Sequence, residues 1–220
     1  MLRKPIFYVL SYVVASVVAT NVMVLNMLST IVKDRHIAIG GSTQTRRGDF
    51  AVILMLAFSC SARFVVGVLM YRLGPVRWAP RFLLTAASLS VAGQLCLVFD
   101  VDLLLPVGIT FLGLSDGTIW CSSAWLVMQS FGAAHTATIY GIIVFSVAIF
   151  SSVVSYGIET AVYGAQPSIQ MSSGDQQECS TGIYCFRATH VVACVLTFVA
   201  VICSAMFTKW FRSRFGIGVL

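Results

Sequence analysis

Three charged residues lie inside long apolar segments and could bind a charged ligand or a proton: Asp116, Arg63 and Glu159. Charged side chains are costly at membrane depth, so each is a functional candidate if these segments cross a bilayer. Asp116 could bind a proton or a cationic group. Arg63 could hold an anionic solute or pair with Asp116 or Glu159. The alternative for each is structural: a hydrogen bond or brace to a neighbouring helix, or, for Glu159, a position at the water interface.

The residues around Asp116 suit a site inside a helix bundle. Trp120 follows one turn later, and Ser123 shares the same helical face. Gly113 and Gly117 lie beside Asp116, and such small residues allow two helices to approach closely. We therefore expect another helix to pack directly against this segment.

Small or polar residues also accompany the other candidates. Ser59 and Gly67 lie one turn before and one turn after Arg63, and serines at i−7 and i−4 precede Glu159. Asn21 and Asn26 lie in the first apolar segment, where amides could hydrogen-bond a solute or join two helices. Each of these groups therefore has both a functional and a structural interpretation.

The composition indicates an integral membrane protein. The 220 residues are 58% hydrophobic and only 10% charged, whereas a soluble domain carries about 25% charged residues. The net charge is +6, but the basic residues lie between apolar segments, where they act as topology signals and lipid headgroup contacts. We expect no nucleic-acid partner.

The apolar segments are long enough to cross roughly 30 Å of hydrocarbon as helices. This predicts an all-α membrane domain of six spans over residues 1–220. The spans are expected at about 6–32, 50–71, 82–99, 103–128, 139–165 and 188–208.

The distribution of basic residues predicts the orientation, because cytoplasmic loops are enriched in lysine and arginine. One side carries eight such residues and the other four, with Arg187 near the end of the last span. The richer side, with both termini, is expected in the cytoplasm. Its basic residues are Arg3, Lys4, Arg72, Arg77, Arg81, Lys209, Arg212 and Arg214.

Two cysteines, Cys179 and Cys185, lie in the polar loop at about 166–187, which is expected outside the cytoplasm. A disulfide between them is one alternative in an oxidising compartment, and two free thiols are the other. No cluster of metal ligands and no Walker-type loop occurs in the sequence, so we expect no metal, no cofactor and no enzyme activity.

The connection between the second and third spans carries a motif. It reads Gly-x-Leu-x-x-Arg-x-Gly-x-x-Arg and resembles the loop motif of the major facilitator superfamily, at the place where that family has it. Two residues depart from the family's pattern: Tyr71 replaces its acidic residue, and Pro75 replaces an arginine. The matching residues are Gly67, Leu69, Arg72, Gly74 and Arg77.

The region from Phe50 onward resembles the C-terminal half of nodulin-like major facilitator proteins. The likeness rests on the order of Gly113–Gly117–Trp120, Phe131-Gly132, Tyr140 and Cys179…Cys185-Phe186-Arg187, where Phe186 replaces a tyrosine. The resemblance implies that Asp116 and Asn21 lie on cavity-lining spans.

The resemblance implies a secondary transporter that moves a small solute by alternating access, with proton coupling as one variant. The family has twelve spans and this chain has six. We therefore expect either a fragment with a missing N-terminal half or a half-transporter that pairs with a second six-span chain. Other possibilities are a non-transporting remnant and a subunit of an oligomeric channel.

Overall fold

The computed structural model describes residues 5–37, 44–99, 104–164 and 183–215. These residues form an all-helical bundle, and six of the helices are long and apolar enough to cross a membrane, as predicted. The helices are α1 (Pro5–Ile37), α2 (Gln44–Leu73), α3 (Pro75–Val98), α4 (Leu104–Phe131), α5 (Thr136–Gly164) and α6 (Ile183–Phe215), with a short 3₁₀ turn, η1 (Ala133–His135), before α5.

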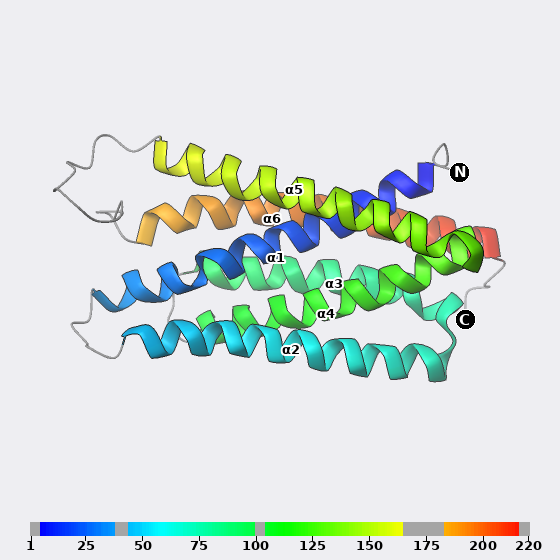
Figure 1. The fold of residues 1–220 in the computed structure, drawn as a ribbon, viewed down its shortest axis with the longest axis horizontal. Coiled ribbons are helices and arrows are strands. Elements are labelled where there is room, and N and C mark those ends of the chain that lie inside the picture. Colours follow the sequence, from blue (N-terminus) through cyan, green and yellow to red (C-terminus); the bar gives the residue numbers. More distant parts are fainter. Residues whose placement is uncertain (1–4, 38–43, 100–103, 165–182, 216–220) are drawn as a thin grey trace.

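The six helices lie roughly side by side along the long axis of the molecule (Figure 1). α1 is the most buried of them, and α2 and α5 are among the least buried. Within the described helices, the backbones of α2 and α5 do not come close to each other; the two helices lie at opposite edges of the bundle (Figure 1). The N-terminal end of α1, the C-terminal end of α6 and the junction between α2 and α3 lie at the same end of the bundle (Figure 1).

The packing has an approximate internal symmetry. α1 packs against α5 and α6, and α4 packs against α2 and α3 in the same way. If α1, α2 and α3 are exchanged with α4, α5 and α6, most packed helix pairs are replaced by other packed pairs. The α3–α6 pair and the α1–α4 pair are unchanged by this exchange. Because α1 and α4 run in opposite directions (Figure 1), the two three-helix units have inverted topologies.

Two apolar clusters form the core, and a polar layer separates them. One cluster uses α1 up to Val18 and α4 from Ile119 onward, and the other uses α1 from Ala19 onward and α4 up to Leu112. Apolar packing thus holds the helices together on both sides of the middle of the bundle, along its long axis. The buried polar residues of this middle layer include Thr20, Asn21, Ser59, Ser90 and Ser115.

A single residue separates α2 from α3. Gly74 has a φ of +89°, a conformation that residues with a Cβ rarely adopt. Its backbone N–H donates to the carbonyl oxygen of Met70 (3.1 Å). α3 begins at Pro75, where proline is well tolerated because the first N–H groups of a helix have no intrahelical partner. The motif therefore forms a very tight turn.

The third helix begins earlier than the predicted span at residue 82. The segment from Arg77 to Arg81 contains two basic residues and a proline, a composition that favours a loop. In the structure α3 continues through Pro80, which removes only one backbone hydrogen bond near the helix start. α1 and α2 also extend beyond the predicted bounds, to Ile37 and back to Gln44.

Tryptophan and arginine pair at the end of the bundle that holds this turn. The guanidinium of Arg81 lies 4.8 Å from the ring centre of Trp78, and that of Arg214 lies 5.4 Å from the ring centre of Trp210. Such pairs are typical of membrane–water interfaces. The Cys179–Cys185 pair lies outside the described residues.

Candidate functional site

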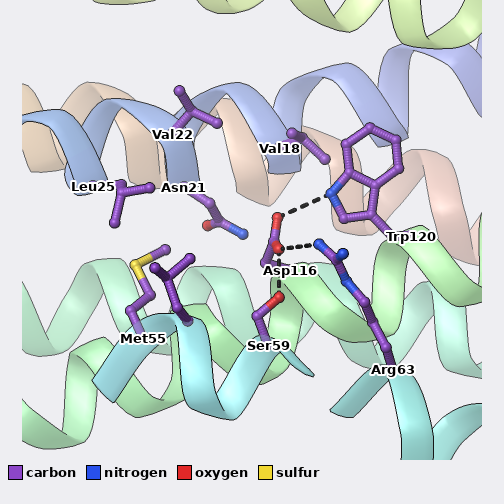
Figure 2. Close-up of a pocket in the computed structure, with 10 residues that line it drawn as sticks. Val18, Asn21, Val22, Leu25, Met55, Ser59, Arg63, Asp116 and Trp120 are labelled. Carbon is purple, nitrogen blue, oxygen red and sulfur yellow. Dashed lines mark hydrogen bonds and ion pairs between the residues drawn. The ribbon is translucent and has the colours of Figure 1, made fainter. Parts of the chain in front are cut away.

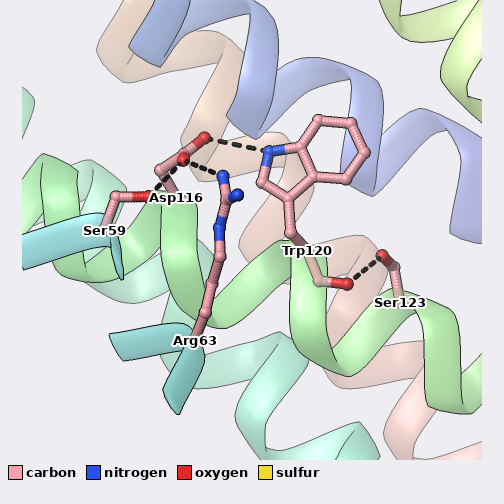
Figure 3. Close-up of polar contacts among 5 residues, drawn as sticks. All are labelled: Ser59, Arg63, Asp116, Trp120 and Ser123. Carbon is pink, nitrogen blue, oxygen red and sulfur yellow. Dashed lines mark hydrogen bonds and ion pairs between the residues drawn. The ribbon is translucent and has the colours of Figure 1, made fainter. Parts of the chain in front are cut away.

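Asp116 is the centre of a hydrogen-bonded cluster formed by α2 and α4. Its Oδ2 accepts hydrogen bonds from the hydroxyl of Ser59 (2.7 Å) and from Nη2 of Arg63 (3.1 Å), which also forms an ion pair with it. Its Oδ1 accepts from the indole Nε1 of Trp120 (3.2 Å). All three contacts appear in Figures 2 and 3. Of the two acidic partners considered for Arg63, the structure selects Asp116.

Two glycines allow α2 and α4 to approach closely enough for this cluster. A Cβ on Gly113 would lie 2.5 Å from the carbonyl oxygen of Met55, and one on Gly117 would collide with the carbonyl oxygen of Ser59. The backbone of α2 therefore packs directly on the glycine face of α4. The predicted close approach at Gly113 and Gly117 is confirmed, and it brings Ser59 within reach of Asp116.

The ion pair lies deep in the predicted membrane region. At 1.5 Å per residue, Asp116 is roughly 18 Å from the start of α4 at Leu104 and roughly 22 Å from its end at Phe131. The side chain of Arg63 is 51% exposed, whereas that of Asp116 is 17% exposed. An exposed guanidinium at this depth is unfavourable against lipid tails. This face of the bundle therefore requires a polar or aqueous environment.

A pocket of about 220 Å³ opens beside the ion pair. Its volume is below the roughly 300–1,000 Å³ of pockets for drug-sized ligands, so it suits a small molecule. Asn21, Ser59, Arg63, Asp116 and Trp120 supply its polar groups. Its apolar wall comes from α1 and α2 and consists of Val18, Val22, Leu25, Met55 and Leu56 (Figure 2).

Asn21 joins the pocket to the polar layer behind it. Its Oδ1 accepts a hydrogen bond from the hydroxyl of Ser90 on α3 (3.1 Å). The side chain is only 1% exposed, and its amide nitrogen has no hydrogen-bond partner among the described residues. In Figure 2 this nitrogen points toward Asp116. Unpaired buried donors are rare in proteins, so this one marks a position where an acceptor would be bound favourably.

Aromatic side chains continue the site toward α5. The rings of Trp120 and Tyr140 meet edge to face, with centres 6.3 Å apart. Ser123 shares the face of Asp116, as expected, but its hydroxyl donates to the backbone carbonyl oxygen of Trp120 (3.1 Å; Figure 3). Ser123 therefore does not contact the carboxylate.

Other candidates lie elsewhere. Asn26 is exposed on α1 and does not line the pocket. Glu159 lies on α5, but the described side chains of that helix end at Gly157. The loop-motif residues lie outside the pocket, on α2, at Gly74 between the helices, and at Arg77 near the start of α3. Among them Gly67 faces Cys121, whose Sγ lies 3.8 Å from the point where a Cβ on this glycine would be.

A second buried polar contact lies on the far side of α3. Nδ1 of His190 on α6 lies 2.9 Å from Oε1 of Gln94. His190 is 2% exposed and Gln94 is fully buried. Neither lines the pocket. This contact joins α3 and α6.

Sequence reasoning missed Ser90 and the apolar wall of the pocket. Ser90 and Gln94 are spaced by one helical turn, and this spacing was an available signal for a buried polar stripe. Met55 and Leu56 carried no such signal, because apolar residues in a membrane segment can face lipid, protein or a cavity.

The arrangement can bind a small solute that carries a polar or charged group next to an apolar body. Among the described residues it holds one accessible cation, one buried unpaired amide and an apolar wall. No family model, no curated protein and no solved structure matches this chain with significant similarity.

Proposed function

We propose that this protein moves a small solute across a membrane by alternating access, as half of a secondary transporter of the major facilitator type. The observation that carries the proposal is the Arg63–Asp116 ion pair, which lies near the middle of two membrane-length helices and beside an open pocket. Ionisable groups at this depth commonly mark solute or proton pathways.

The internal symmetry of the bundle supports the same proposal. Inverted three-helix repeats are the building units of each half of a major facilitator transporter, and solute sites lie near the membrane midplane. The described helices have such a repeat, and the pocket lies at the level of the polar layer between the two apolar clusters.

A second six-helix unit completes the proposed transporter. The exposed guanidinium of Arg63 and the pocket entrance need a partner that excludes lipid. Either the other half of a longer protein or a second copy of the chain could cover this face. In the proposed orientation both termini and the turn at Gly74 lie in the cytoplasm, because basic residues are concentrated at that end.

Proton coupling is the variant of the proposal that assigns a role to Asp116. Binding of a proton to this carboxylate would remove the charge that holds Arg63 in place. The same step would free the guanidinium for another partner. If protons drive transport, the substitution Asp116→Asn should change the pH dependence of uptake. An unchanged pH dependence would exclude proton coupling but not transport itself.

Alternating access can be tested before the solute is known. In a cysteine-free background, Leu56→Cys places a thiol in the pocket wall, at a side chain that is 50% exposed. A membrane-impermeant maleimide reacts with thiols that reach water. The proposal predicts labelling of Leu56→Cys when the reagent is added to either side of sealed vesicles.

Phe198→Cys provides the matched control. Phe198 is 56% exposed on α6, outside the pocket, and is expected to face lipid and remain unlabelled. If Leu56→Cys is as unreactive as Phe198→Cys, the pocket is closed to water and the transport proposal fails. Passage of the reagent or of ions through the vesicle wall would indicate the channel alternative.

A further inference from the structure

We infer that the pocket beside Arg63 selects a small organic anion with an apolar body, such as an aliphatic carboxylate, and that Asp116 positions Arg63 without contacting the solute. This inference rests on the proposed function, because it names the solute class of that site. It follows from the hydrogen-bond capacity that remains in the pocket after all internal contacts are made.

The acceptors of the pocket are largely used. Asp116 accepts three hydrogen bonds, from Ser59, Arg63 and Trp120, and a carboxylate has about four acceptor positions. It is also the less exposed member of the ion pair, at 17%. The hydroxyl proton of Ser59 and the indole N–H of Trp120 are both directed to this carboxylate. A cationic solute would therefore find little free negative charge.

The donors of the pocket remain available. Arg63 makes one hydrogen bond within the described residues, through Nη2, out of about five N–H groups on a guanidinium. Its side chain is half exposed, so its other N–H groups can reach a solute. Asn21 adds a buried amide nitrogen that has no partner in the described part of the chain. A carboxylate could accept from both.

The remaining wall sets the shape of the rest of the solute. The apolar side chains from α1 and α2 that line the pocket favour an alkyl or aromatic body next to the anionic group. Inorganic anions or acetate would satisfy the donors but leave this wall exposed, so they should bind more weakly than a longer carboxylate.

The test uses three probes that share one alkyl chain: hexanoate, hexanamide and hexylammonium. Binding to the purified 220-residue chain in lipid nanodiscs is measured by isothermal titration calorimetry, with empty nanodiscs correcting for partition into lipid. We expect hexanoate to bind at least about tenfold more tightly than hexylammonium, as hydrogen bonds to charged groups allow. Equal affinities, tighter binding of hexylammonium, or binding of none of the three would overturn the inference.

Asn21→Asp is the sharpest variant, because it replaces an amide donor with an acceptor of the same shape. The hydroxyl of Ser90 can still donate to the remaining oxygen. We expect hexanoate binding to be lost and hexylammonium binding to rise; unchanged hexanoate affinity would contradict the assignment. If Asn21→Asp does not fold, Asn21→Leu tests the loss of the donor alone.

Arg63→Gln should also remove the preference for hexanoate, and Arg72→Gln is its matched control. Both changes remove one arginine charge from α2, but Arg72 lies in the last turn, outside the pocket. The inference and the proposed function fail separately. Selective hexanoate binding without labelling of Leu56→Cys from both sides would refute transport only, whereas such labelling without hexanoate binding would refute the solute class only.

Discussion

Gly117 on α4 faces the backbone carbonyl oxygen of Ser59 on α2 so closely that no side chain fits between them. The same Ser59 donates its hydroxyl to Asp116 (2.7 Å), one residue before Gly117. Backbone packing and the charged cluster are therefore linked: the helix separation that glycine permits is also the separation that the hydrogen bonds of Asp116 require.

Gly117→Ala should separate α2 from α4 and weaken the cluster. Its new methyl group would overlap the Ser59 carbonyl and the Cβ of Ala62. We expect a loss of about 1–3 kcal/mol in the free energy of unfolding, as for other overpacked sites. The measurement is an unfolding titration with SDS in mixed micelles.

Gly141→Ala on α5 is the control for that substitution. Gly141 has open space where a Cβ would lie, and alanine favours helix by up to about 1 kcal/mol over glycine. We expect unchanged or slightly higher stability. Equal destabilisation by Gly117→Ala and Gly141→Ala would show that the close helix packing at Gly117 is not the cause of the stability loss.

The Arg63–Asp116 pair should show energetic coupling in a double-mutant cycle. Either single change, Arg63→Gln or Asp116→Asn, leaves an unpaired charge at membrane depth, whereas the double variant leaves neither of the two charges. We expect the double variant to be more stable than the sum of the single effects predicts, by roughly 0.5–3 kcal/mol. The lower part of that range is favoured because Arg63 is half exposed. Additive effects would mean that the pair contributes no net stabilisation.

Gln94→Leu should destabilise the contact between α3 and α6. It removes the acceptor 2.9 Å from Nδ1 of His190, in a fully buried position. Removing this partner from a buried polar group costs about 1–3 kcal/mol. Because the pair lies outside the pocket, the hexanoate affinity of the folded protein should not change. Thr110→Val, which removes only a hydrogen bond within α4, should have a smaller effect on the melting temperature.

Gly74→Ala should destabilise the turn between α2 and α3. The φ of +89° at this residue is unfavourable for alanine, by about 1–2 kcal/mol, although space for a methyl group is available. We expect a lower melting temperature with unchanged ligand binding. A wild-type melting temperature would show that the turn adopts another conformation at no cost.

The amino-acid sequence by itself determined the class of the fold and the candidate charges. Six long apolar segments with few charges favour membrane-spanning helices over a soluble core, and in a bilayer their backbone groups must be satisfied inside helices. For the same reason, Asp116 and Arg63 could be singled out: a charged residue in such a segment is rare and needs a physical explanation. Gly113 and Gly117 likewise indicated a close helix contact.

Only the tertiary structure decided which partners meet. Arg63 had two acidic candidates, and the packing of α2 on α4 selects Asp116. Asn21 and Asn26 looked equivalent, but one lies buried beside the pocket and the other is exposed. Residues far apart in the chain meet through the rotation and separation of packed helices. These depend on the whole set of side-chain contacts, so the spacing within one segment cannot specify them.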